Sequence, residues 1–263
     1  MKTDNIYYDK RHIQFLEALW GEGYLSPGGA SEVDLLLQGI NISNKSILDI
    51  GCGSGGITSS LVTNYHAKRV VGIDIEDEVC IAAQARVDNL KLGDKINIFK
   101  VKPGVFPFKN CSFDIVFSKD SIVHIENKEL LSKEIFRVLK FGGMFVCSDW
   151  LRSDDNAPSA AMSHYLQLED LGFEMASPNR YKRALTQAGF KNIILKNRNH
   201  WYREQAKKEV STLAILRRKE FELISSKEYM DLTVETWQAM IKVLETGEHC
   251  PHHIWSSKLK NPF

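Results

Sequence analysis

The sequence lacks long hydrophobic runs and an excess of either charge. No apolar run approaches the roughly 18 residues that a membrane span requires, and the first residues show no apolar core of a secretory signal. The 34 basic and 33 acidic residues give a net charge of +1. We therefore expect neither a membrane nor a nucleic acid as the main partner.

Cysteines are also few: there are 5 in 263 residues, an odd number, and they are scattered along the chain. A disulfide framework usually shows an even number at short spacings. Reduced thiols and a cytoplasmic location are therefore expected. The run His249-Cys250-Pro251-His252-His253 holds metal-capable side chains, but no second ligand cluster accompanies it. We expect no metal site.

What the sequence does contain is a glycine-rich turn between an apolar run at 47–50 and an amphipathic stretch at 57–65. The turn carries Gly51, Gly53 and Gly55, which let a backbone approach a ligand closely. Asp49 precedes it, where its carboxylate can order the turn or accept a hydrogen bond from a ligand ammonium. A second apolar run, 70–75, contains Asp74, placed to accept hydrogen bonds from ribose hydroxyls. A dinucleotide-binding domain would use a similar turn.

Strand and helix patterns alternate over residues 47–147, which is typical of a parallel sheet with helices on both faces. A helix is predicted at 5–20, followed by a glycine-rich loop and a helix at 32–38. After Asp149 the pattern becomes mainly helical, with helices at 162–171, 177–188, 201–224 and 234–244, a short strand at 192–196, and a tail rich in His and Trp. We expect one integrated α/β domain with N-terminal helices and a lid loop (1–44), a central core (45–149), and the remaining core strands together with a helical cap (150–263).

Four segments in order resemble the motifs of class I S-adenosylmethionine (SAM) methyltransferases: 48–55, Asp74, 112–117 and 138–145. The later motifs decide against the dinucleotide alternative. The resemblance implies a Rossmann-like fold, SAM as cofactor and S-adenosylhomocysteine (SAH) as product. It places Asp49 and the turn glycines at the amino-acid end of SAM, Asp74 and Ile75 at the ribose, Ser118 and Lys119 beside the methyl donor, and Leu25 and Ser26 over the front.

Residues 21–29 and 118–124 are similar to segments of phosphoethanolamine N-methyltransferases and of bacterial glycine, sarcosine and dimethylglycine methyltransferases. This resemblance implies a small amine as acceptor and a catalytic dyad of Tyr8 and His124, with Asp120 near the ammonium. The chemistry agrees, because an amine must lose a proton before it attacks a methyl group, and histidine is a suitable base near neutral pH. The alternatives are a structural role for His124 and simple packing for Tyr8.

The sequence departs from the phosphoethanolamine enzymes in two ways. Trp150 stands where their phosphate-binding tyrosine is expected, and Glu169 and Asp170 stand near the position of an arginine–tyrosine pair. Acids there would repel a phosphate, so we expect a preference for unphosphorylated amines. No acid follows the third predicted strand, which leaves the adenine to backbone and apolar contacts near residues 101–103. An O- or C-methyltransferase and a non-catalytic SAM-binding module remain open alternatives.

Overall fold

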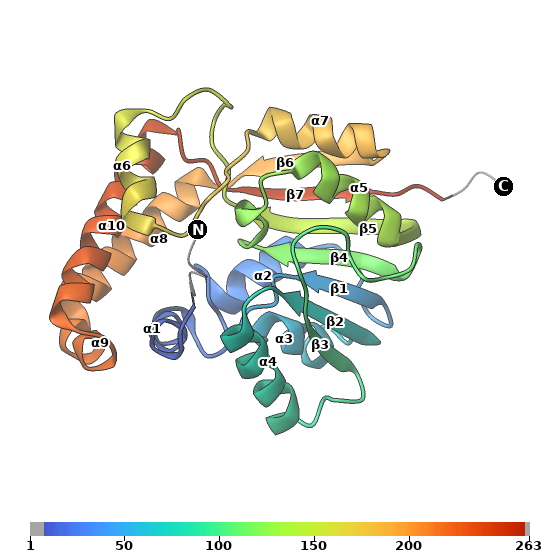
Figure 1. Cartoon of the computed structure of the whole chain (residues 1–263), viewed down its shortest axis with the longest axis horizontal. Helices are drawn as coiled ribbons and strands as arrows, with labels where there is room; N and C mark the ends of the chain where they lie inside the picture. Colours follow the sequence, from blue (N-terminus) through green and yellow to red (C-terminus); the bar gives the residue numbers. More distant parts are fainter. Residues whose placement is uncertain (1–7, 261–263) are drawn as a thin grey trace.

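The computed structural model describes residues 8–260, and a seven-stranded sheet of order β3-β2-β1-β4-β5-β7-β6 forms its centre (Figure 1). β7 runs antiparallel to its neighbours β5 and β6, whereas the pairs from β3 to β5 are parallel. The strands are β1 (Ser46–Ile50), β2 (Arg69–Asp74), β3 (Ile96–Lys100), β4 (Phe113–Lys119), β5 (Leu139–Asp149), β6 (Lys191–Asn197) and β7 (His252–Ser257).

Helices cover both faces of the sheet, as the alternating pattern predicts. One apolar core lies between the sheet and α2 (Gly29–Leu37), α3 (Gly56–Thr63) and α4 (Asp77–Asn89). A second lies between the sheet and the helices α5 (Lys128–Val138) and α7 (Pro178–Ala188). Every residue of β1 is buried, Asp49 included, which explains why its apolar residues do not alternate with exposed polar ones.

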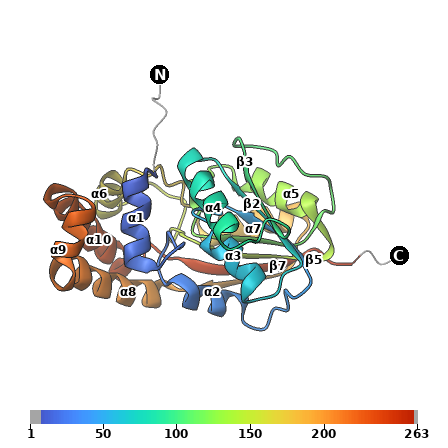
Figure 2. The ribbon, with the colours of Figure 1, turned by 90° about the horizontal axis from the view of Figure 1, so that it is seen from below.

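The remaining helices gather beyond one end of the sheet, where they form a cap with its own apolar core (Figure 2). They are α1 (Lys10–Trp20), α6 (Ala160–Glu169), α8 (Asn199–Ser211), α9 (Arg218–Ile224) and α10 (Lys227–Thr246). A one-turn helix, η1 (Ile122–His124), follows β4. α1 comes from the start of the chain and the other cap helices from its second half, so the space between cap and sheet is built from distant parts of the sequence.

One sequence prediction about this region is wrong, and one strand is not located by the sequence. The helix predicted at 201–224 is divided into α8 and α9 by the π-helical turn η2 (Thr212–Leu216) and by Arg217. The division lets Phe221 pack on Phe15 at 5.1 Å and lets Arg217 donate to the carbonyl of Ala18 at 2.9 Å. The tail expected after 244 contains β7, which lies inside the sheet. Residues 5–7 of the first predicted helix lie outside the described residues, and α1 begins at Lys10, where Asp9 caps it.

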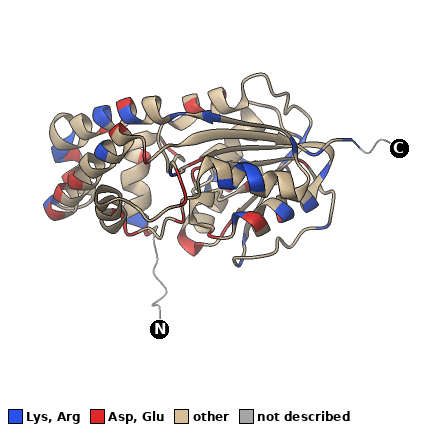
Figure 3. Cartoon of the chain, turned by 90° about the horizontal axis from the view of Figure 1, so that it is seen from above, with Lys and Arg blue, Asp and Glu red and all other residues tan. Residues whose placement is uncertain are grey.

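In the view from above, basic and acidic residues are interspersed along the outer helices (Figure 3). Within residues 8–260, no helix combines the length and the apolar character needed to cross a membrane.

Candidate active site

The glycine turn after β1 borders a cavity of about 570 Å³. The amides of Gly51 and Cys52 donate to the carbonyl of Ile73 at 2.8 and 3.0 Å, which holds the turn against the end of β2. Gly51 has φ +70, and a Cβ there would lie 1.9 Å from the Oγ of Ser121. Glycine is therefore required by both the backbone conformation and the available space.

Two predicted cofactor residues near this turn do not line the cavity. Gly55 does not line the cavity but packs against Ala83 of α4. Asp49 is buried and accepts a hydrogen bond from Thr58 Oγ1 at 2.6 Å. Burial raises the pKa of Asp49 to about 7. The sequence allows two functions for this carboxylate. The contact with Thr58 supports the first of them, the ordering of the turn and of α3.

Asp74 lies at the edge of the same cavity, at the end of β2. Its carboxylate accepts hydrogen bonds from the amides of Ile75, Glu76 and Gly53 at 2.8, 3.2 and 3.1 Å. Burial raises its pKa, while these amides oppose the shift. The amide of Ile75, which we predict to meet the ribose, is thus bound to Asp74 itself. A carboxylate has further lone pairs with which to accept from a diol.

Lys119, at the end of β4, ties the loop 21–28 to the sheet. Its buried ammonium donates to Ser26 Oγ at 2.7 Å, to the carbonyl of Pro27 at 2.9 Å and to Asp120 Oδ2 at 2.7 Å. Leu25 in the same loop lies against Gly53. Leu25, Ser26 and Lys119 all line the cavity, so the loop forms part of its wall.

Ser118 does not line the cavity. Its hydroxyl donates to the carbonyl of Ile50 at 2.8 Å and contacts Ser121 Oγ at 3.1 Å. This hydroxyl joins the carboxyl ends of β1 and β4, which lie side by side because the two strands are parallel.

Asp120 adopts φ +53, a left-handed conformation, and its carboxylate is anchored on several sides. Besides Lys119, it accepts from Ser148 Oγ at 2.7 Å and from Tyr202 Oη at 2.9 Å. Tyr202 belongs to α8, 82 positions further along the chain, and the sequence gives no signal that connects the two. The result is a carboxylate held in one position at the end of β4, beside its partner Lys119.

His124 is held with one ring nitrogen toward the backbone. Its Nδ1 lies 2.9 Å from the carbonyl of Leu171, and its ring packs on Phe173 at 5.2 Å. Because a carbonyl only accepts, Nδ1 carries the proton and Nε2 has the lone pair of the neutral ring. Burial lowers the pKa of His124. The ring is therefore neutral at pH 7 and able to accept a proton.

Tyr8 lies just before α1 and stacks on His12 at 5.2 Å. Burial, together with the charges of Asp74 and Glu169, raises its pKa. Its hydroxyl therefore stays protonated and can donate a hydrogen bond.

A second cavity, of about 560 Å³, adjoins the first beneath the cap. Residues that line both cavities are Tyr8, Leu25, Ser26, Asp120, His124 and Leu171. The structure thus brings together all three predicted catalytic residues, although Tyr8 and His124 are 116 positions apart (124 − 8). The hydrogen-bonded dyad between these two side chains remains a prediction.

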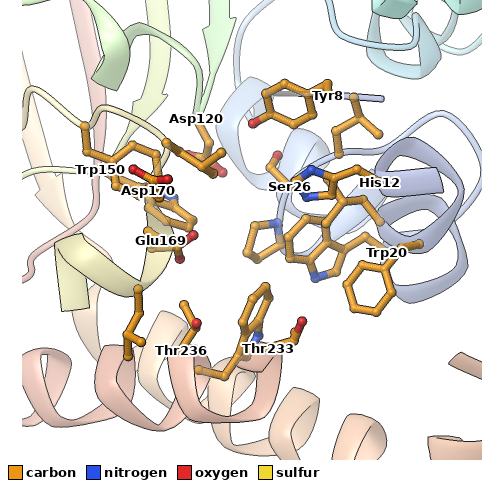
Figure 4. A pocket seen from close by; sticks show the side chains of 18 of the residues that line it. Tyr8, His12, Trp20, Ser26, Asp120, Trp150, Glu169, Asp170, Thr233 and Thr236 are labelled. Atoms are coloured by element: carbon orange, nitrogen blue, oxygen red, sulfur yellow. The ribbon is translucent and has the colours of Figure 1, made fainter. Parts of the chain in front are cut away.

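The walls of the second cavity are mainly aromatic and acidic (Figure 4). Glu169 accepts from Tyr165 Oη at 3.0 Å, and burial raises its pKa to about 7. Trp150 and Asp170 also line this cavity, as do Trp20 and Trp237. None of the described lining residues is a lysine or an arginine.

The histidines of the predicted tail make contacts within the fold. His253 contacts Glu32 at 2.7 Å, and Glu32 also accepts from the guanidinium of Arg198 at 2.8 and 3.0 Å. His249 Nδ1 lies 3.1 Å from the carbonyl of Leu151. In residues 8–260 no group of three or more His, Cys, Asp or Glu side chains has an arrangement that could hold a metal ion.

Comparison with known proteins agrees with this geometry. Residues 48–147 match the family described as a methyltransferase domain. Phosphoethanolamine N-methyltransferase 1 of Arabidopsis thaliana is 28% identical over 93% of this chain and 49% of its own length. The phosphoethanolamine N-methyltransferase of Plasmodium falciparum is 27% identical over 91% of this chain and 88% of its own. The chain thus spans about half the length of its plant relatives.

Solved structures show the same architecture. Phosphoethanolamine N-methyltransferase 2 of Haemonchus contortus, in complex with phosphomonomethylethanolamine and SAH, has a TM-score of 0.87 at 23% identity, over 98% of this chain and 60% of its own. A candidate sarcosine dimethylglycine methyltransferase from Galdieria sulphuraria has a TM-score of 0.82 at 18% identity, over 96% and 98%. The predicted fold class is confirmed: the chain has the Rossmann-like fold that these methyltransferase structures share, and its residues 48–147 match a methyltransferase domain.

Proposed function

We propose that the chain is a SAM-dependent N-methyltransferase whose acceptor is a small-molecule amine. The observation that carries the proposal is that two cavities of similar size meet at Tyr8, Asp120 and His124, beyond the carboxyl end of β4. Ligands of open α/β sheets bind at that edge. The relatives named as phosphoethanolamine N-methyltransferases support amine methylation.

The first cavity fits SAM. Gly51 and Gly53 line it at the turn, Asp74 is placed for a ribose diol, and residues 101–104 line the side where an adenine would pack. When bound, SAM supplies an electrophilic methyl group: the nitrogen lone pair forms the N–C bond while the S–C pair passes to sulfur and leaves SAH. The protein's task is mainly to align the amine and remove its proton.

The residues at the junction have the properties that this task requires. His124 accepts the proton of the ammonium at Nε2, since Nδ1 is bound to the carbonyl of Leu171. Tyr8 keeps its own proton and orients the amine or the histidine. Asp120, held by Lys119, Ser148 and Tyr202, offers a carboxylate oxygen to the amine at the junction.

The composition of the second cavity favours unphosphorylated amines. Glu169 and Asp170 line it, and the described lining offers no lysine or arginine to bind a phosphate. We therefore expect the acceptor to differ from phosphoethanolamine. We also propose a cytoplasmic location, which the free state of all five cysteines supports. We propose no nucleic-acid partner.

Calorimetry with SAM and SAH, followed by a methyl-transfer assay on a panel of amines, alcohols and carbon acids, tests the proposal. We expect SAM binding and methylation of at least one amine. Transfer to oxygen or carbon alone would favour an O- or C-methyltransferase. Tight SAM binding without any transfer would favour a non-catalytic SAM-binding module, and a lack of SAM binding would contradict all three functions.

A further inference from the structure

The second cavity is larger and more apolar than glycine, sarcosine or phosphoethanolamine requires. Its volume of about 560 Å³ lies within the roughly 300–1,000 Å³ of pockets that bury drug-sized ligands. Building on the proposed function, we propose that the acceptor is a cationic amine with an aromatic or long alkyl body. Its ammonium pairs with Glu169 as the amine enters, before the nitrogen reaches His124 and loses its proton, and its body packs against the indoles of Trp20 and Trp237.

The two indoles form a fixed wall. Trp20 of α1 and Trp237 of α10 lie 6.2 Å apart, with an interplanar angle of 29°. Their Nε1 atoms donate to the two oxygens of one buried carboxylate, Glu209 of α8, at 2.7 and 2.9 Å. This arrangement satisfies both polar N–H groups away from the cavity and leaves aromatic surface for a ligand. Pre-organised aromatic faces bind apolar groups and cations at a low cost in side-chain entropy.

Glu169 provides the charge. It is the last residue of α6, and its side chain points into the cavity (Figure 4). Tyr165 donates to Oε1 at 3.0 Å, and a carboxylate can accept further hydrogen bonds at its remaining lone pairs. An ammonium placed there would stabilise the ionised carboxylate in surroundings that otherwise disfavour it.

Two threonines at the floor of the second cavity offer hydrogen-bond acceptors instead of donors. The hydroxyls of Thr233 and Thr236 on α10 donate to the carbonyls of Tyr229 and Leu232 at 2.8 and 2.9 Å. With their protons used within the helix, they present oxygen lone pairs to a ligand. Such a floor suits the N–H groups of a cation and provides nothing for a phosphate or for the carboxylate of an amino acid. Anionic and zwitterionic acceptors are therefore disfavoured along with phosphoethanolamine.

The test compares kcat/KM for 2-phenylethylamine and tryptamine with that for glycine, sarcosine and phosphoethanolamine, using the unaltered chain and saturating SAM. We expect the arylalkylamines to exceed the others by at least about tenfold, the effect of roughly one to two buried methylenes. A higher value for glycine, sarcosine or phosphoethanolamine would overturn this inference and leave N-methylation standing. Methyl transfer to none of the amines would contradict the proposed function itself.

A binding measurement tests the role of Glu169 separately. With SAH bound, Glu169→Gln should weaken 2-phenylethylamine by about 10–100-fold, the loss of a charged hydrogen bond. Glu174→Gln removes the same charge five positions later, at an exposed residue outside the described lining of both cavities, and should change affinity by no more than about twofold. Equal affinities of the wild type and Glu169→Gln would overturn the pairing. 3-Phenylpropionate, an anion of similar shape, should not compete, and its competition would also contradict the pairing.

Discussion

At the scale of single residues, the account rests on a few carboxylates and one histidine whose surroundings assign them different functions. Asp49 and Asp74 are both acids beside the glycine turn, yet the first is bound to Thr58 inside the fold and the second faces the cavity. Asp120 is anchored by protein donors, and Glu169 is bound to Tyr165. The residue type alone does not distinguish these functions, but the contacts do.

Asp74→Ala should weaken SAM binding by roughly 1–3 kcal/mol, because a hydrogen bond from the ribose to a charged group is lost. Asp77→Ala is a suitable control: this acid is exposed, pairs with Lys100 and does not line either cavity. Calorimetric titration with SAM measures both variants. Unchanged affinity in Asp74→Ala would remove the basis for placing the ribose there.

His124→Ala should slow methyl transfer by about 10²–10⁴-fold while SAM still binds. Because burial lowers the pKa of His124, the wild-type rate should fall as the pH drops through a value below the usual 6.5, where the ring becomes protonated and can no longer accept a proton. The pH profile of kcat should lose this limb in His124→Ala. Any limb caused by the amine's own ionisation should persist.

The exposed His200 of α8 provides the control for that experiment, since His200→Ala should leave the pH profile as it is. Near-normal turnover in His124→Ala would show that the histidine only packs on Phe173, and Asp120 would become the next candidate for the base.

At the scale of elements, the glycine turn and its flanking strands could be predicted because their signals are local. An apolar run, glycines at positive φ and an acid after the next strand are all close together in the chain. The sequence does not locate β7, since its place between β5 and β6 depends on pairing with strands far away in the sequence. The break between α8 and α9 is not predicted for a related reason: the packing of Phe221 on Phe15 outweighs local helix propensity.

The turn itself can be tested with Gly51→Ala. Left-handed backbone costs a residue with a side chain about 1–2 kcal/mol, and the new Cβ would collide with Ser121. We expect weaker SAM binding and a lower free energy of unfolding. Gly93→Ala is the matched control, because nothing lies within 4 Å of a Cβ at that position. Equal SAM affinity in the two variants would contradict a close approach of the ligand to this turn.

The cap helices depend on Glu209, whose carboxylate joins α8 to Trp20 on α1 and to Trp237 on α10. Glu209→Ala leaves both buried indole N–H groups without this acceptor and should lower the free energy of unfolding in urea by about 1–3 kcal/mol. Glu204→Ala, on the exposed side of the same helix, should have little effect. A urea midpoint of Glu209→Ala equal to that of Glu204→Ala would show that this carboxylate does not stabilise the cap.

At the scale of the whole molecule, the site is made by joining the two ends of the chain to its centre. Tyr8, α1 and the loop 21–28 come from the beginning of the chain, and the edge of the sheet comes from its middle. The other cap helices come from its second half. β7 lies within the sheet, so the part after residue 149 is inseparable from the core. We therefore propose one integrated unit. The sequence could predict the residues at the junction through resemblance, but the size and aromatic character of the second cavity follow from cap packing alone.

The central claim is that the two cavities bring a methyl donor and an amine together at Tyr8, Asp120 and His124. The most direct measurement incubates the purified chain with SAM carrying a deuterated methyl group and the amine panel, then locates the label by mass spectrometry of the products. The account predicts the intact labelled methyl group on an amine nitrogen, with an equal amount of SAH. Bound SAM with no labelled amine, or label confined to oxygen or carbon, would contradict it.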